Sequence, residues 1–148
     1  MFKHILIPTD GSKLALKGIK AGVKLARALG ARVTGLYVVA PYAPAMYGEA
    51  AMYVPGLSAR DYKRNGARAA RKALAMVESE ARRPGVPFAA KVIYGALPWE
   101  GILRAARSGK CDAVAMASHG RGGLGGLILG SETQRVLAHS RIPVLVVR

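Results

Sequence analysis

Short runs of apolar residues alternate along this chain with longer segments in which apolar residues recur at helical spacing. The apolar runs occupy residues 4–7, 32–39, 87–94, 113–118 and 144–147. The helical segments are 13–29, 58–82, 98–108 and a last one that starts at Ser131 and is closed by Ile142-Pro143. Strands that are apolar throughout and separated by helices are typical of a parallel sheet covered on both faces. The order therefore predicts an α/β fold in which five strands alternate with four helices.

Because crossover connections are right-handed, few topologies remain for such a chain, and the pattern favours a doubly wound sheet with helices on both faces. The chain has 148 residues, which corresponds to one domain over 1–148 at about 150 residues per domain. Residues with capping preferences mark the helix ends. Gly30 suits the end of the first helix, Ser58 the start of the second and Pro98 the start of the third. Ser131 is expected to cap the last helix, with Gln134 completing a capping box.

The chain holds one cysteine, Cys111, which excludes an internal disulfide and a zinc site built from several cysteines. A single cysteine is compatible with a reducing cytosol. The longest apolar strings, such as residues 144–147, are far shorter than the ~18 residues that a membrane helix needs. The apolar run near the N-terminus is also too short for the core of a signal peptide. We therefore expect a cytoplasmic protein with no membrane span.

Two loops of the predicted sheet carry residues that suit a ligand site. In a doubly wound sheet, ligands bind beyond the carboxyl ends of the strands, at the point where the strand order reverses. The loop after the first strand holds Asp10, and the loop after the fourth strand, residues 119–130, is rich in glycine. If the first and fourth strands are neighbours, both loops line one crevice.

The glycine-rich loop leads into the last helix, and this combination suits phosphate. Glycine allows backbone N–H groups to turn toward a ligand. The helix N-terminus adds unpaired N–H groups and the positive end of the helix dipole. The Ser131 hydroxyl is placed to bond a phosphate oxygen. Asp10 is placed to accept hydrogen bonds from a ribose or a base, or to hold a divalent metal with the phosphates.

Each of these features also has a purely structural explanation. Ser131 is a good N-cap residue whatever else it does. A glycine-rich loop is often only a connection, and Asp10 can simply begin the first helix. The nucleotide hypothesis rests on the occurrence of all three features at strand ends of one sheet.

Three stretches of the sequence resemble one known family when taken together. The chain reads Ile5-Leu6-Ile7-Pro8-Thr9-Asp10-Gly11-Ser12 near its start, Met116-Ala117-Ser118-His119-Gly120 after the fourth strand with Gly130-Ser131 nine residues further on, and a characteristic ending over 136–147. In these motifs the chain resembles the universal stress protein family, over residues 3–148. The resemblance implies a five-stranded parallel sheet in the order 3-2-1-4-5. It also implies a homodimer formed through the C-terminal strand, residues 144–147.

The ATP-binding branch of that family carries Gly-x-x-Gly, then nine residues, then Gly-Ser or Gly-Thr. Gly120, Gly130 and Ser131 match this pattern. Ala117 stands where the first glycine is expected, and its methyl group either weakens binding or marks the branch that binds no nucleotide. Glu132 is a second departure, because a carboxylate in the first helical turn suits the dipole but repels phosphate.

By this resemblance the crevice would hold ATP, with or without Mg²⁺. Asp10 would face the adenosine part and Val38 the base, while residues 116–120 and 130–132 would line the ribose and phosphates. Arg121 and its neighbour His119 flank the phosphate position, although Arg121 is equally consistent with a solvated loop charge. The implied nucleotide-binding residues are Pro8, Thr9, Asp10, Val38, Met116, Ala117, Ser118, His119, Gly120, Arg121, Gly130, Ser131 and Glu132.

Lysine and arginine outnumber the acidic residues by 23 to 8, and many of them lie on the first two helices. On the first helix they fall within an arc of about 80°: Lys13, Lys17, Lys20, Lys24 and Arg27. On the second helix they spread over about half the circumference: Arg60, Lys63, Arg64, Arg68, Arg71 and Lys72. A solvated outer face explains such stripes, but the excess charge also attracts polyanions such as nucleic acid, anionic lipid or acidic proteins.

The sequence therefore predicts a stress-response sensor or regulator that binds ATP. Turnover is expected to be slow or absent, at most a weak ATPase. The only candidate general base near the phosphates is His119, and it lies in the motif region that the resemblance associates with binding. One alternative is a basic interaction protein that contacts polyanions and binds no nucleotide. Another is an enzyme on the same fold, which would need His-x-Gly-His or Ser-Gly-Gly-x-Asp-Ser after the first strand, where this chain has Thr9-Asp10-Gly11-Ser12.

Residues 41–57, with several Tyr and Met, are expected either to form a lid or partner surface or to fold onto their own domain.

Overall fold

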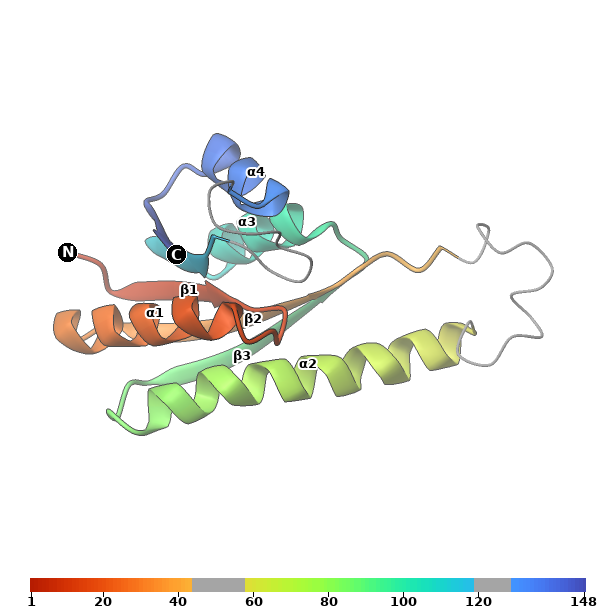
Figure 1. The fold of residues 1–148 in the computed structure, drawn as a ribbon, viewed down its shortest axis with the longest axis horizontal. Coiled ribbons are helices and arrows are strands. Elements are labelled where there is room, and N and C mark those ends of the chain that lie inside the picture. Colours follow the sequence, from red (N-terminus) through yellow and green to blue (C-terminus); the bar gives the residue numbers. More distant parts are fainter. Residues whose placement is uncertain (44–57, 119–128) are drawn as a thin grey trace.

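The computed structural model of the chain describes residues 1–43, 58–118 and 129–148. Five strands and four helices alternate along these residues, as the sequence predicts (Figure 1). The strands are β1 (His4–Pro8), β2 (Arg32–Val39), β3 (Phe88–Tyr94), β4 (Ala113–Ala117) and β5 (Val144–Val147). The helices are α1 (Ala15–Leu29), α2 (Ala59–Arg82), α3 (Pro98–Ser108) and α4 (Ser131–His139). The predicted lid or partner surface at residues 41–57 lies mostly outside the described residues.

All five strands run parallel in the order β3-β2-β1-β4-β5, which confirms the predicted topology. β1 lies at the centre of the sheet, where Ile5 is in register with Val33 of β2 and with Ala113 of β4. Neighbouring strands and two layers of helices cover β1, so that Ile5 and Leu6 are fully buried. The strand order reverses between β1 and β4, which places the switch point of the sheet between these two strands.

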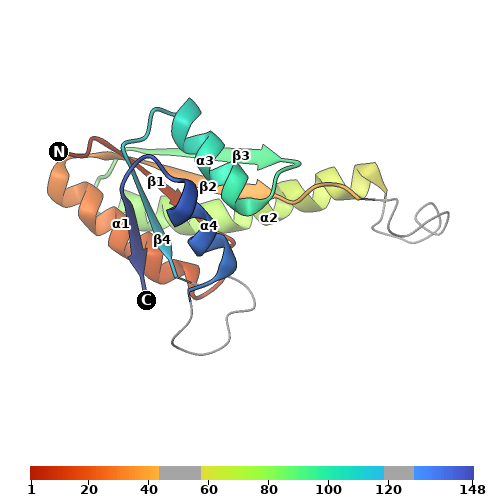
Figure 2. The same ribbon diagram turned by 90° about the horizontal axis from the view of Figure 1, so that it is seen from above.

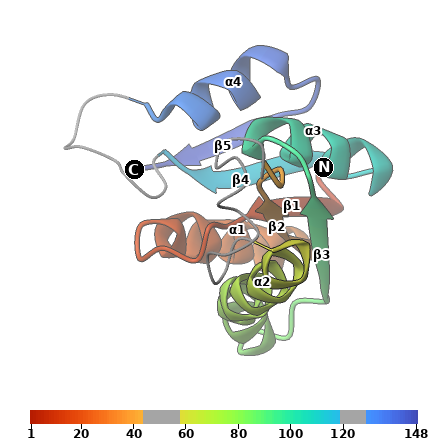
Figure 3. The same ribbon diagram turned by 90° about the vertical axis from the view of Figure 1, so that its right-hand side faces the viewer.

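Each face of the sheet has its own core, because successive residues of a strand point to opposite faces. On one face, Ile7 packs in the same cluster as Ile19 of α1 and Val77 of α2. On the other face, Leu6 packs with residues of α3 and α4, including Val136. Figure 3 shows α1 and α2 on one side of the sheet and α3 and α4 on the other. The helices therefore cover both faces, as expected for a doubly wound sheet.

Several helix ends agree with the sequence signals. Gly30 ends α1 with a φ of 62°, in the left-handed conformation that glycine adopts readily. The Ser58 hydroxyl accepts a hydrogen bond from Asp61 N at 3.0 Å and so caps α2. Pro98 lies in the first turn of α3. α2 is 24 residues long and extends beyond the strands (Figure 2). Within the described parts of the chain, no helix is both long and apolar enough to cross a bilayer.

The start of α4 differs from the prediction that Ser131 is its cap. Gly130 is the N-cap, because its backbone is extended and its carbonyl accepts the first intrahelical hydrogen bond, from Gln134 N at 3.0 Å. Glycine has no side chain with which to form a capping box. Gln134 Nε2 instead donates to Leu129 O at 2.7 Å. Ser131 is therefore the first helical residue, one position after the cap.

Other ends shift by a few residues. α1 begins at Ala15 rather than at residue 13, and the Ser12 hydroxyl accepts a hydrogen bond from Ala15 N at 3.1 Å. α4 ends at His139, before the Ile142-Pro143 pair, because the backbone of Ser140 is already extended. β1 continues to Pro8, β3 starts at Phe88 and β4 ends at Ala117. None of these shifts moves a strand or helix to a different place in the fold.

Candidate functional site

The chain leaves β1 at the switch point through a tight turn that carries Thr9 and Asp10. Thr9 is buried, and its N–H donates to Leu36 O at 2.9 Å, which continues the pairing of β1 with β2. The Thr9 hydroxyl accepts from Gly11 N at 3.1 Å, and Asp10 Oδ1 accepts from Ser12 N at 2.9 Å. Gly11 has a φ of 75°, which favours glycine. The turn therefore fixes the half-buried Asp10 at the carboxyl edge of the sheet.

Hydrogen bonds at the end of β4 join Ser118, which precedes the glycine-rich loop, to Gly130, the last residue of the loop. Ser118 is buried, and its N–H donates to Val147 O at 2.8 Å. Its carbonyl accepts from Gly130 N at 2.9 Å and from Thr133 Oγ1 at 3.0 Å. Residues 118 and 130 are thus held together, and the start of α4 lies directly against the end of β4.

The first turn of α4 presents backbone donors at this edge. Intrahelical hydrogen bonds begin with Gln134 N, so the N–H groups of Ser131, Glu132 and Thr133 have no partner within the helix. Such groups, with the helix dipole, are suited to an anion. Thr133 is almost fully buried and also donates to Ala117 O at 3.3 Å. Sequence reasoning missed Thr133, because its partners lie 15 and 16 residues earlier and no local pattern marks them.

α1 packs unusually close to the end of β4. A Cβ atom built on Gly18 would lie 2.5 Å from Ala117 N and 2.8 Å from the carbonyl carbon of Met116. Only a residue without a side chain allows this approach. The pairing of β1 with β4 covers Ile5–Ala113 and Leu6–Val114, before the carboxyl ends of both strands. Gly18 therefore helps to hold the helix that follows the Asp10 turn against β4.

Glu132 directs its carboxylate to α3. Its Oε2 atom accepts a hydrogen bond from Trp99 N at 2.8 Å, in the first turn of α3, and its Oε1 atom lies 3.5 Å from Arg135 Nη1. A carboxylate at a helix N-terminus is stabilised by the positive end of the helix dipole. The Trp99 ring packs against the core of this face and lies at a tilt against His139, with 4.8 Å between ring centroids. The carboxylate that was expected to oppose phosphate is thus bonded to another helix.

Val38 occupies a different part of the same edge. It lies near the end of β2, in register with Ile93 of β3, and is half-buried. A Cβ atom built on Gly101 of α3 would lie 2.6 Å from Val38 Cγ2. Val38 therefore packs against α3, on the face of the sheet that α3 and α4 cover.

The structure brings together most of the predicted site residues that it describes. Those at the ends of β1 and β4 share the switch point with the first residues of α4: Pro8, Thr9, Asp10, Met116, Ala117, Ser118, Gly130, Ser131 and Glu132. His119, Gly120 and Arg121 lie outside the described residues. This edge therefore offers the backbone donors of α4, which suit an anion, and the carboxylate of Asp10, which is a hydrogen-bond acceptor. No group of three or more metal-ligating side chains occurs in the parts of the chain that the structure describes.

A buried polar cluster lies at the opposite, amino end of the sheet. His4 Nε2 lies 2.8 Å from Thr34 Oγ1, and Cys111 Sγ is 3.7 Å from the ring nitrogens of His4. Burial and the nearby Arg32 lower the pKa of His4, whereas burial raises the pKa of Cys111. A thiol with a raised pKa is unreactive. The cluster therefore indicates a structural role for Cys111, which lies two residues before β4.

Asp112 belongs to the same end of the sheet. Its carboxylate accepts hydrogen bonds from Lys3 N at 2.8 Å and from His4 N at 3.0 Å. Desolvation raises the pKa of Asp112, but these backbone hydrogen bonds outweigh it, so that the pKa is lowered overall. These contacts attach the start of β1 to the start of β4.

Comparison with known proteins identifies the family. A model of the universal stress protein family matches residues 1–148. The chain is 34% identical over 148 residues to a universal stress protein of Thermus aquaticus, and the match covers 100% of both chains. A universal stress protein from Archaeoglobus fulgidus, solved in complex with dAMP, superposes with a TM-score of 0.71 at 15% identity, covering 100% of this chain and 98% of that one. A universal stress protein solved in complex with cAMP gives a TM-score of 0.67 at 21% identity, covering 99% and 97%.

The two solved structures support the fold, and the family model and the Thermus aquaticus relative extend the likeness to the whole sequence. The motifs at both ends of the chain and the strand order 3-2-1-4-5 agree with that assignment. This chain belongs to the universal stress protein family.

Proposed function

We propose that this protein binds an adenine nucleotide, ATP, at the carboxyl ends of β1 and β4 and acts as a sensor or regulator in a stress response. The observation that carries the proposal is the pair of hydrogen bonds to Ser118 O from Gly130 N and Thr133 Oγ1. They hold the first turn of α4 against the end of β4, one strand away from Asp10. Two relatives of the same fold have been solved with cAMP and with dAMP, which supports an adenine nucleotide here.

Each part of the nucleotide has a matching group in this proposal. The N–H groups of residues 131–133 donate to phosphate oxygens, and the Ser131 hydroxyl, which is exposed, adds a further donor. The Asp10 carboxylate accepts hydrogen bonds from the ribose hydroxyls. The carboxylate of Glu132 accepts a hydrogen bond from Trp99 N, which directs its charge toward α3. Mg²⁺, when bound with ATP, would neutralise charge between the phosphates and Asp10.

The proposed site extends over all the residues that the resemblance implies. Val38 contributes the apolar surface for the base, and Pro8, Thr9 and Met116 form the floor at the strand ends. His119, Gly120 and Arg121 contribute from the glycine-rich loop. Ala117 lowers the affinity relative to a glycine, because its methyl group occupies space next to the ligand. Turnover is slow or absent in this proposal. The rate at which inorganic phosphate is released from ATP measures it directly.

Isothermal titration calorimetry with ATP and MgCl₂ tests the site. Asp10→Asn removes a charged acceptor and should weaken binding about 10- to 100-fold, as expected for a charge-assisted hydrogen bond of ~1.5–3 kcal/mol. Glu100→Gln is the matched control, because it removes an exposed carboxylate from the first turn of α3. Equal affinity of Asp10→Asn and the control would refute the assignment of Asp10.

Two further variants separate the loop from the rest of the site. Gly130 has a φ of −57° and a ψ of 146°, an extended conformation that valine also adopts, so Gly130→Val should fold. Its side chain would stand before the donors of α4 and abolish binding. Ala117→Gly should tighten binding. Retention of affinity in Gly130→Val would place the ligand elsewhere.

We also propose that the protein is a cytoplasmic homodimer paired through β5. β5 is an edge strand, and Leu145 on it is 40% exposed. Exposed apolar edges favour pairing with a second strand. Leu145→Lys should therefore give monomers in sedimentation experiments. Leu97→Lys, at an exposed leucine distant from β5 in the chain, should leave the dimer intact.

A further inference from the structure

The positive charge of this protein is concentrated on one layer of the fold. The segments that form the α1/α2 layer, residues 13–29 and 58–83, contain thirteen lysines and arginines and three acidic residues, a surplus of ten positive charges. The helices α3 and α4 on the other face contain three arginines and two acidic residues, a surplus of one. Most of the net charge of +15 therefore lies on the face that α1 and α2 cover.

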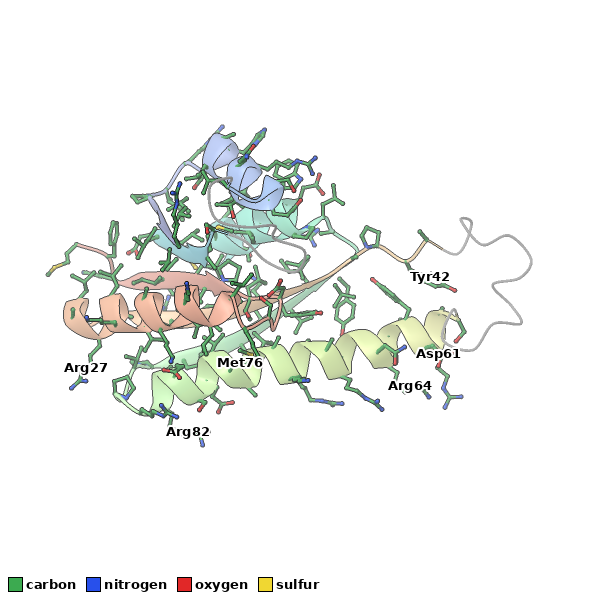
Figure 4. All side chains as sticks on the ribbon, in the orientation of Figure 1. Arg27, Tyr42, Asp61, Arg64, Met76 and Arg82 are labelled. Carbon is green, nitrogen blue, oxygen red and sulfur yellow. The ribbon has the colours of Figure 1, made fainter. Side chains whose placement is uncertain are left out.

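All thirteen basic residues of this layer are exposed. Both helices bury one side against the sheet, through residues such as Ile19 and Val77, so that their basic sides point outward together. In Figure 4 the labelled side chains of Arg27, Arg64 and Arg82 project away from the sheet. The layer thus presents one broad basic surface, which we call the α1/α2 basic face.

Few of these charges are compensated within the protein. On the α2 side, Arg64, Arg82 and Arg83 pair with Asp61, Glu78 and Glu80. Among the residues that the structure describes, no basic residue of α1 takes part in an ion pair, and α1 contains no acidic residue. Like charges at successive helical turns repel each other. A solvated surface needs polar residues but does not need them to be of one sign.

We propose that the α1/α2 basic face binds the phosphate backbone of double-stranded nucleic acid. The 24 residues of α2 span about 36 Å at 1.5 Å per residue, comparable to one turn of a duplex. Most basic residues of α2 are arginines, whose planar groups bind phosphate oxygens in pairs. Such binding depends on charge and is independent of base sequence.

Two observations favour a duplex over a single strand and over a membrane surface. Single strands are bound by stacking on exposed aromatic rings. The basic residues of α1 and α2 do not alternate with exposed rings, because Tyr62, the one aromatic residue within these two helices, is partly buried against Tyr42 and Tyr94 and donates its hydroxyl to Ala40 O at 2.6 Å. A membrane surface is bound by a helix that inserts an apolar face, but the apolar sides of α1 and α2 are buried against the sheet.

Fluorescence anisotropy with a labelled 24-base-pair DNA, in the absence of nucleotide, tests this proposal between 50 and 200 mM NaCl. Each phosphate contact makes affinity fall about 3.5-fold over this range, from a slope of about 0.9 per contact. The variant Lys17→Gln/Lys20→Gln/Lys24→Gln/Arg27→Gln should bind more weakly and with a smaller salt dependence. If all four residues contact phosphate, the factor by which the affinity falls between 50 and 200 mM NaCl should be about 150-fold smaller for the variant than for the unmodified protein.

The matched control removes the same number of exposed charges from the rest of the surface: Arg104→Gln/Arg107→Gln/Lys110→Gln/Arg141→Gln. It should keep most of the affinity and the salt dependence of the unmodified protein. Circular dichroism confirms that both variants are folded. Equal losses in the two variants, or no binding at 50 mM NaCl, would overturn the proposal.

Two further measurements identify the binding partner and the site. Vesicles that contain phosphatidylserine should bind more weakly than the duplex, and tighter binding to vesicles would mean a membrane surface instead. Stoichiometric ATP should leave the duplex bound, because the switch point lies at the carboxyl edge of the sheet and not on the basic face. Displacement of the duplex by ATP would contradict the assignment to α1 and α2.

Discussion

The close approach of α1 to β4 leads to a sharp prediction for Gly18→Ala. The added Cβ atom would lie 2.5 Å from Ala117 N and 2.8 Å from Met116 C, both backbone atoms that cannot rotate away. The helix and strand must separate by about 0.9 Å before the shorter distance reaches ordinary van der Waals contact at 3.4 Å. Gly22→Ala, one turn further along α1, is the matched comparison. There the nearest atom is Ile7 Cδ1 at 2.7 Å, the end of a flexible side chain.

The expected magnitudes follow from two opposing effects. Alanine stabilises a helix interior by about 1 kcal/mol relative to glycine. Overpacking against a fixed backbone costs about 3 kcal/mol, the upper part of the usual range. Gly18→Ala should therefore lower the free energy of unfolding by about 2 kcal/mol, which corresponds to a decrease in Tm of about 4–8 °C for a chain of this size. Gly22→Ala should stay within about 1 kcal/mol of the unmodified protein, because a rotation of Ile7 relieves part of the contact.

Urea denaturation followed by circular dichroism measures both variants, with the midpoint and slope taken from the same curves. The comparison is internal, since both substitutions add one methyl group to the same helix and gain the same helix propensity. If Gly18→Ala is as stable as Gly22→Ala, α1 does not press on the end of β4 as described, and the reasoning fails.

Three other changes test the contacts at the two ends of the sheet. Burial lowers the pKa of His4, so this histidine takes up a proton in the unfolded chain before it does so in the folded protein as the pH falls. The contribution of His4 to stability should therefore be full above about pH 6.5 and decrease below it. His4→Asn should flatten this pH dependence in thermal melts at pH 7.5 and 5.5. Thr133→Val should cost about 1–2 kcal/mol through loss of the hydrogen bonds to Ser118 O and Ala117 O, with Thr133→Ser largely restoring the urea midpoint; an unchanged midpoint in the valine variant would disprove the contact. Glu132→Gln should lower the free energy of unfolding by about 0.5–1 kcal/mol, because it removes the charge that caps α3 at Trp99 N. The melting temperature should fall slightly, and high salt should reduce the difference.

The sequence predicts the elements of this fold well because their signals are local. The apolar runs and helical spacing give, in order, the five strands and four helices that the described residues form, and Gly30 and Ser58 mark true helix ends. The strand order, by contrast, came from the resemblance to a family, since periodicity leaves more than one arrangement of the strands. The sequence also points directly to Asp10 and to the glycine-rich loop, because glycine and carboxylate patterns after a strand are local; their part in binding stays a prediction.

The errors concern contacts between distant parts of the chain. Serine is a common N-cap residue, so the sequence favours Ser131. In the structure the hydrogen bond from Gly130 N to Ser118 O places Gly130, the preceding residue, at the N-cap of α4. The Glu132 carboxylate accepts its hydrogen bond from Trp99 N, which is 33 residues away in the sequence. Neither bond leaves a periodic trace in the sequence. The close packing of Gly18 is hidden for the same reason, because a glycine within a helix gives no indication of which strand it will meet.

The bond between Gly130 N and Ser118 O has a consequence for how such a protein can change. It closes the ring of chain between residues 118 and 130 with groups of the main chain alone, whatever side chains stand between them. This one hydrogen bond therefore does not depend on which side chains the intervening residues carry. Changes of sequence between these two residues are therefore compatible with an unchanged contact between β4 and α4.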